Sequence, residues 1–129
     1  MKTYFIIYVN DLEKSKIFYE LLFNIKPIID EPGMAEFELP DSSTFGIMPN
    51  ISLEKLFGSD FKIEKNRKSL PQTELYFLVE DAIMFHNKAI QLGATEIREF
   101  SKMDWGHKVA YSINHDGHIL AFAELIKNQ

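Results

Sequence analysis

Histidine and carboxylate side chains are the candidates for metal binding and proton transfer in this chain. Its 129 residues include four histidines and no cysteine. The lack of cysteine excludes a disulfide framework, a thiolate metal site and a cysteine nucleophile. His107 follows Trp105-Gly106 near the expected mouth of a strand, so we retain it as a candidate for a binding cleft. Its alternative role is that of a strand residue facing solvent.

The other three histidines have simpler expected roles. His86 falls within a predicted helix, where we expect a partly exposed helix residue. His115 and His118 flank Asp116-Gly117, a spacing that occurs in some metal sites. That dipeptide is also typical of a hairpin tip, and we expect both histidines to be solvated turn residues.

Composition and charge indicate a folded, acidic, single-domain protein. The chain has 46% hydrophobic and 26% charged residues, a net charge of −5 and a pI near 5.3. The sequence has no run of lysine and arginine, so we expect neither nucleic acid nor an anionic membrane as a partner. The apolar run YFIIYV near the start is too short for a signal peptide or a membrane span, so we expect a cytoplasmic protein.

The first 50 residues read as one strand, one helix and three strands. Residues 4–9 predict a strand, and Asn10 or Asp11 can cap a helix that begins at Leu12. Asn24 and Pro27 predict the end of this helix near Phe23. Further strands are expected near residues 28–29, 34–39 and 44–48. The apolar helix residues expected on one face are Ile17, Phe18, Leu21 and Leu22.

The same pattern restarts after residues 51–72, which form a polar connection with a short helix near 53–57. A strand at 74–79 is followed by Asp81 as a cap, a helix at 82–92 and Gly93 as its end. Three strands are then expected near 96–99, 108–113 and 119–125.

The two halves match in register. Val9, Asp11 and Leu22 recur as Val79, Asp81 and Leu92, each seventy positions later. After an insertion of five residues, Asp41 and Phe45 correspond to Asp116 and Leu120. We therefore predict an α+β protein of two βαβββ modules, one about 1–50 and the other about 73–129, within a single domain of residues 1–129.

Two phrases at opposite ends of the chain resemble one superfamily. VNDLEKSKIFYELL at residues 9–22 is similar to the opening strand and helix of the glyoxalase, bleomycin-resistance and dioxygenase superfamily, which has the vicinal oxygen chelate fold. WGHKVAYSINHDGH at residues 105–118 resembles its final hairpin, and LGA at 92–94 matches the end of its second helix. Asn114-His115 departs from the Asp-Pro that is usual there. The resemblance implies paired βαβββ modules, an open half-barrel cleft and a homodimer.

The resemblance also identifies positions that bind metal in the superfamily's metal enzymes. Here those positions are Tyr4, Gly46, Glu74 and Ala121. Gly46 and Ala121 have no donor atom in their side chains, and Tyr4 is a poor ligand unless it is ionised. We therefore predict no metal and no other cofactor. Metal-dependent glyoxalase chemistry, extradiol ring cleavage and thiol transfer to fosfomycin are disfavoured.

Small residues at these positions favour a ligand pocket instead. If Ile119, Ala121 and Ala123 alternate onto the concave face while Leu120 and Phe122 pack under the helices, that face has space for a guest. Aromatic side chains could stack on the guest, and Glu74 could neutralise a positive group. The predicted ligand-binding residues are Tyr4, Gly46, Glu74, Tyr76, Trp105, His107 and Ala121. For each aromatic residue, simple core packing stays an alternative.

Three functions remain open from the sequence. The first is a metal-independent dimer that sequesters an amphipathic or cationic compound, as in bleomycin-resistance members that confer antibiotic resistance. The second is a lyase or isomerase with Glu74 as general base and Tyr4 or His107 as proton donor. The third is a structural dimer with a vestigial cleft.

Overall fold

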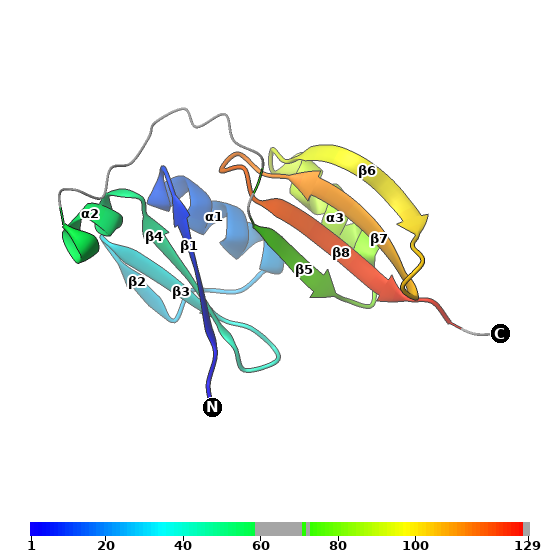
Figure 1. Cartoon of the computed structure of the whole chain (residues 1–129), viewed down its shortest axis with the longest axis horizontal. Helices are drawn as coiled ribbons and strands as arrows, with labels where there is room; N and C mark the ends of the chain where they lie inside the picture. Colours follow the sequence, from blue (N-terminus) through cyan, green and yellow to red (C-terminus); the bar gives the residue numbers. More distant parts are fainter. Residues whose placement is uncertain (59–70, 72, 128–129) are drawn as a thin grey trace. The chain divides into compact units, whose positions relative to one another are not determined.

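The computed structural model of this chain describes residues 1–58, 71 and 73–127, and it divides into two compact units, Met1–Lys68 and Ser69–Gln129 (Figure 1). Each unit contains a four-stranded mixed sheet, and the protein is α+β, as predicted. Most of the expected polar connection, residues 59–70 and 72, lies outside the described residues. No helix in the described ranges is long and apolar enough to cross a membrane.

The first unit has the predicted strand–helix–three-strand order followed by a short helix. Its sheet has the order β1-β4-β3-β2, in which β1 and β4 are parallel and the other pairs are antiparallel. The elements are β1 (Tyr4–Val9), α1 (Leu12–Phe23), β2 (Ile29–Glu31), β3 (Met34–Glu38), β4 (Thr44–Pro49) and α2 (Ile51–Phe57).

The second unit repeats this topology. Its sheet has the order β5-β8-β7-β6, again with one parallel pair, β5 and β8, and two antiparallel pairs. The elements are β5 (Glu74–Leu78), α3 (Ala82–Gln91), β6 (Thr95–Lys102), β7 (His107–Ile113) and β8 (Ile119–Leu125). In Figure 1, α3 covers one face of this sheet.

The predicted helix caps are confirmed in both units. The Asp11 carboxylate accepts a 3.1 Å hydrogen bond from the backbone N–H of Lys14, and Asp81 accepts one of the same length from Met84. The first helix ends at Asn24, which has the left-handed conformation with φ of 53°. These contacts satisfy backbone groups that a helix end leaves unpaired.

The turns that precede β4 and β8 also share one structure. In the first turn the backbone N–H of Leu39 donates to the carbonyl of Ser43, and that of Ser42 donates to Leu39. In the second, Asn114 donates to His118 and Gly117 donates to Asn114, so each pair of bonds recurs seventy-five positions later. The predicted equivalence of the two turns is therefore confirmed.

The first core forms where α1 packs on its sheet. The ring of Tyr19 lies 4.9 Å from that of Phe45, and both residues are buried. The predicted inward face of α1 is wrong in two positions, because Ile17 and Leu21 are 51% and 50% exposed. The buried face instead contains Ser15, Phe18, Tyr19 and Leu22. Those residues follow the helical spacing of three and four, whereas Ile17 and Leu21 lie on its flank.

The second core forms between α3 and the sheet of β5–β8. The Phe122 ring stacks between Phe77 and Phe85, each with a centroid distance of 5.4 Å. His86 of α3 is only 4% exposed, so its expected partial exposure is wrong. Its Nε2 lies 2.7 Å from a carboxylate oxygen of Glu96 on β6, whereas its buried Nδ1 has no hydrogen-bond partner among the described residues.

Candidate functional site

The candidate site is the face of the β5–β8 sheet that lies opposite α3, which we call the open face. Residues paired across neighbouring strands project from the same side of a sheet. Ala121 of β8 pairs with Tyr76 of β5 and with Tyr111 of β7, whereas its neighbour Phe122 packs under α3. The predicted alternation of β8 is therefore present. The open face includes Glu74, Tyr76, Leu78, Arg98, Met103, Trp105, His107, Val109, Tyr111, Ile119, Ala121 and Ala123.

The small residues of β8 do not leave an empty space in this unit. Ala121 and Ala123 are completely buried, together with Val109 of β7. Tyr76 and Tyr111 pack against this cluster, which also includes Met103. The prediction of free space over the alanines is therefore wrong, because long side chains from adjacent strands cover them. The open face therefore presents an aromatic surface in place of a cavity over the alanines.

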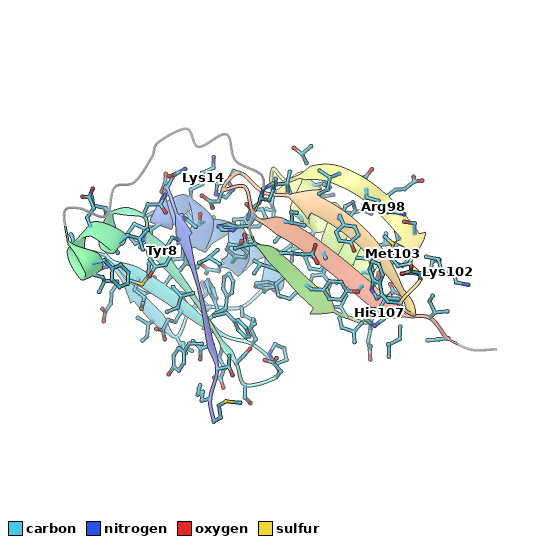
Figure 2. All side chains as sticks on the ribbon, in the orientation of Figure 1. Tyr8, Lys14, Arg98, Lys102, Met103 and His107 are labelled. Carbon is cyan, nitrogen blue, oxygen red and sulfur yellow. The ribbon has the colours of Figure 1, made fainter. Side chains whose placement is uncertain are left out.

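Three aromatic side chains from distant segments form a hydrogen-bonded group, which we call the Tyr76 group. The Tyr76 hydroxyl lies 2.5 Å from Nδ1 of His107, and it also accepts a 3.0 Å hydrogen bond from the indole N–H of Trp105. The Tyr76 and His107 rings are 5.7 Å apart. Tyr76 and His107 are half-buried, while Trp105 is 52% exposed. Figure 2 shows His107 and Met103 close together on this unit.

Charge on the open face is divided between its two edge strands. Glu74 of β5 is exposed, and no cation pairs with it in the described ranges. Arg98 of β6, labelled in Figure 2, pairs with Tyr111 in the sheet register. Burial raises the pKa of the Tyr111 hydroxyl, the charges of Glu74 and Tyr76 raise it further, and Arg98 lowers it. Tyr111 therefore lies within the electrostatic field of both edges.

The two predicted site residues of the first unit lie on its own sheet. Tyr4 is 54% exposed, and the Lys2 ammonium lies 5.8 Å from the centre of its ring. Gly46 lies between Ile6 of β1 and Glu36 of β3. A Cβ at Gly46 would come within 3.2 Å of the Ile6 side chain, so the strand pairing here favours glycine.

The residues at the positions that the sequence resemblance associates with metal binding, Tyr4, Gly46, Glu74 and Ala121, do not fit a divalent metal centre. In the first unit Tyr4 pairs with Thr44 rather than with Gly46, and Gly46 has no side-chain donor. In the second unit Glu74 pairs with Ile119, and Ala121 is buried beneath tyrosines. Within the described ranges, no three His, Asp or Glu side chains gather as a metal-binding cluster. One carboxylate supplies too few donors for such a centre.

The histidines of the β7–β8 turn have local roles. Nε2 of His115 lies 3.1 Å from the Asp116 carboxylate, and Nδ1 of His118 is hydrogen-bonded to the Thr73 hydroxyl. The predicted turn roles are thus present. His115 is an exposed residue, although its side chain is only 19% exposed, and His118 is half-buried.

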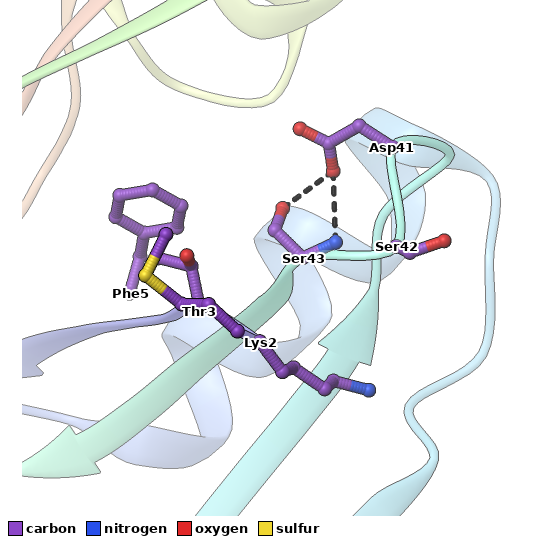
Figure 3. Close-up of a pocket in the computed structure, with 7 residues that line it drawn as sticks. Lys2, Thr3, Phe5, Asp41, Ser42 and Ser43 are labelled. Atoms are coloured by element: carbon purple, nitrogen blue, oxygen red, sulfur yellow. Dashed lines mark hydrogen bonds between the residues drawn. The ribbon is translucent and has the colours of Figure 1, made fainter.

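A shallow pocket of about 340 Å³ lies in the first unit, at the start of β1 (Figure 3). It was not predicted, because its residues come from the chain start and from the turn before β4. The Asp41 carboxylate accepts hydrogen bonds from both the backbone N–H and the hydroxyl of Ser43, which lower the Asp41 pKa. The lining residues are Met1, Lys2, Thr3, Phe5, Asp41, Ser42 and Ser43.

Sequence reasoning missed other residues of the open face, namely Arg98, Met103, Val109 and Tyr111. A signal for Tyr111 was available, because it lies four residues from His107 on one strand and so faces the same way. Met103 lies outside the regular strands, and Arg98 follows an irregular register between β6 and β7. No sequence pattern marked either residue.

Comparison with known proteins supports the fold derived above. A structure of a glyoxalase/bleomycin resistance protein/dioxygenase family enzyme from Burkholderia phytofirmans PsJN is 18% identical, with a TM-score of 0.75 over 96% of this chain and 98% of that one. A structure of a glyoxalase/bleomycin resistance protein/dioxygenase from Nocardioides is 15% identical, with a TM-score of 0.78 over 100% of this chain and 85% of that one. A glyoxalase/bleomycin resistance protein from Albidiferax ferrireducens T118 is 22% identical, with a TM-score of 0.70 over 95% and 97%.

No curated protein sequence matches the chain significantly. The family model described as a glyoxalase-like domain matches residues 2–127, almost the full length. With its two βαβββ units and their matching caps and turns, the chain belongs to the glyoxalase-like domain family, and it shares the fold of the solved proteins described above.

Proposed function

We propose that this protein binds a small cationic or amphipathic organic molecule on the open face of the second unit and acts by sequestering it. The observation that carries the proposal is the Tyr76 group, which lies on the same sheet face as the exposed Glu74 carboxylate. Aromatic ring faces attract cations, and a nearby carboxylate adds a favourable charge interaction. Hydrogen bonds hold the rings in place, so less conformational entropy is lost when a guest binds.

The same proposal includes independence from metal ions. Glycine and alanine at two of the superfamily's metal positions support it, because neither can coordinate a cation through its side chain. We further propose a cytoplasmic homodimer that protects against a toxic compound. The structural similarity to a protein named for bleomycin resistance supports the protective role. Sedimentation analysis tests the dimer.

A thermal-shift and fluorescence experiment tests the binding proposal. The probes are metal-free bleomycin and (2-phenylethyl)trimethylammonium, a small aromatic cation. Trp105 is the sole tryptophan, so its emission reports on the open face alone. We expect a probe at 100 times its Kd to stabilise the fold by about 2.7 kcal/mol and to change the emission. Glu74→Gln should weaken cation binding without unfolding the protein. Unchanged melting temperature and emission with both probes would contradict the proposal.

A second candidate function is that of a lyase or isomerase in which Glu74 removes a proton from carbon. The short Tyr76–His107 hydrogen bond favours it, because a phenol–imidazole pair can supply a proton to a developing oxyanion. The test is exchange of the α-protons of an aryl ketone in D₂O, followed by NMR. Catalysed exchange that disappears in Glu74→Gln would support the enzyme, and exchange equal to that without protein would exclude it for this substrate.

A further inference from the structure

The Tyr76 group contains one more hydrogen-bond donor than it uses. An indole N–H can only donate, so Tyr76 accepts from Trp105. The 2.5 Å contact between Tyr76 and His107 contains one proton, supplied by either partner. If the phenol donates, the imidazole proton is at Nε2 of His107. If Nδ1 donates, the phenol proton of Tyr76 remains.

One donor is therefore left over in both arrangements. With the imidazole uncharged, the three side chains bring three protons, one each from the indole, the phenol and the imidazole, and the two internal bonds use two. Within the described ranges, no further acceptor takes the third proton from Tyr76 or His107. Both residues are half-buried on the open face, so a bound molecule can meet that donor.

The remaining donor lies near a negative charge. Glu74 and Tyr76 are two residues apart on β5 and face the same way, which separates their backbone positions by about 7 Å. Arg98 adds a positive group at the opposite edge strand, next to Tyr111. The face thus offers a carboxylate at one edge, a neutral donor group beside it and a guanidinium across the sheet.

We infer that the ligands of this face are organic cations that also carry a carbonyl or similar acceptor oxygen a few bonds from the positive group. This inference rests on the proposed binding function and adds the oxygen to it. The cation pairs with Glu74, and the oxygen accepts from Tyr76 or His107. When a cation without that oxygen binds, the partly buried donor is left without an acceptor. Such a cation therefore binds more weakly.

A matched pair of probes tests the inference. Phenacyltrimethylammonium and (2-phenylethyl)trimethylammonium have the same charge and ring, and they differ in one carbonyl group. We expect the ketone to bind the intact protein about three- to tenfold more tightly, the range of one neutral hydrogen bond. Isothermal calorimetry and Trp105 emission measure both affinities.

Two variants separate the contributions. Glu74→Gln should weaken both probes by a similar factor and keep the preference for the ketone. The double variant Tyr76→Phe with His107→Phe should remove most of the preference, and circular dichroism checks that it folds. Nitrogen NMR of the His107 imidazole in the intact protein gives a second measurement: addition of the ketone should shift its signals more than addition of the alkyl probe.

The possible failures are distinct. Equal affinity of the two probes for the intact protein would overturn the inference and leave the proposed function standing. A preference for the ketone that persists in the folded double variant would also overturn it. Failure of both probes to bind would contradict the proposed function itself for organic cations of this size.

Discussion

The hydroxyl of Tyr76 lies 2.5 Å from Nδ1 of His107, although 31 residues separate them in the chain. β5 and β7 do not pair directly, because β8 lies between them. The contact therefore spans the buried alanines of β8, and it joins two strands through their side chains. This relationship makes the open face a defined aromatic surface rather than a set of independent side chains.

Removal of the Tyr76 hydroxyl should destabilise the fold more than removal of the Tyr111 hydroxyl. Tyr76→Phe leaves Trp105 and His107 without a shared partner, and we expect a loss of about 1–2 kcal/mol. Tyr111→Phe is the matched control, because no hydrogen bond to that hydroxyl is present in the described part of the chain. Urea denaturation measures both. Equal losses would contradict a structural role for the Tyr76 group.

The repeated turn predicts a stabilising substitution. Ser42 has a φ of 71°, and its counterpart Gly117 has a φ of 82°. The left-handed conformation costs a residue with a Cβ about 1–2 kcal/mol, which the greater chain entropy of unfolded glycine partly offsets. Ser42→Gly should therefore stabilise the protein by about 0.5 kcal/mol.

The reverse exchange, Gly117→Ser, is the control for this effect. A Cβ at Gly117 would meet no heavy atom within 4 Å, so only backbone strain acts there. We expect a similar loss of stability, measured by thermal and urea unfolding. A stabilising Gly117→Ser would show that the two turns are not equivalent.

The stability of the second unit should decrease at high pH through Tyr111. Its pKa is raised above the ordinary tyrosine value of 10.0, first by burial and then by the charge of Glu74. The folded state then binds the phenol proton more tightly than the unfolded state does. The contribution of this proton to the free energy of unfolding is therefore complete below pH 10, and it is lost as the pH rises through the pKa of Tyr111 in the folded state.

Ultraviolet titration of the tyrosines, compared with that of Tyr111→Phe, identifies this group. In Glu74→Gln the Tyr111 pKa should decrease, because one of the negative charges that oppose ionisation is gone. An unchanged titration in that variant would show that Glu74 does not act on the tyrosine.

Local chemistry made the fold predictable. Asp11, Asp81 and Asn24 have side chains or conformations that mark helix ends, and the structure contains each of these caps. The spacing of seventy residues relates the two units from the sequence alone. Such signals depend on neighbours in sequence and need no knowledge of tertiary packing.

The wrong predictions concern residues whose burial depends on tertiary contacts. His86 was expected to be partly exposed, and it is buried because Glu96 of another element satisfies its Nε2. Ala121 was expected to border a space, and tyrosines from the neighbouring strands cover it. The Tyr76–His107 contact depends on the register of three strands, which no short sequence pattern specifies.

Binding at the open face is tested most directly by NMR of ¹⁵N-labelled protein titrated with phenacyltrimethylammonium. The single tryptophan gives one indole N–H signal, so that signal can be assigned to Trp105 without further experiments. We predict saturable shifts of that signal and of the amides near Glu74, Tyr76 and His107. Saturable shifts confined to the pocket at Lys2, Phe5 and Asp41, with the indole signal unmoved, would contradict the account.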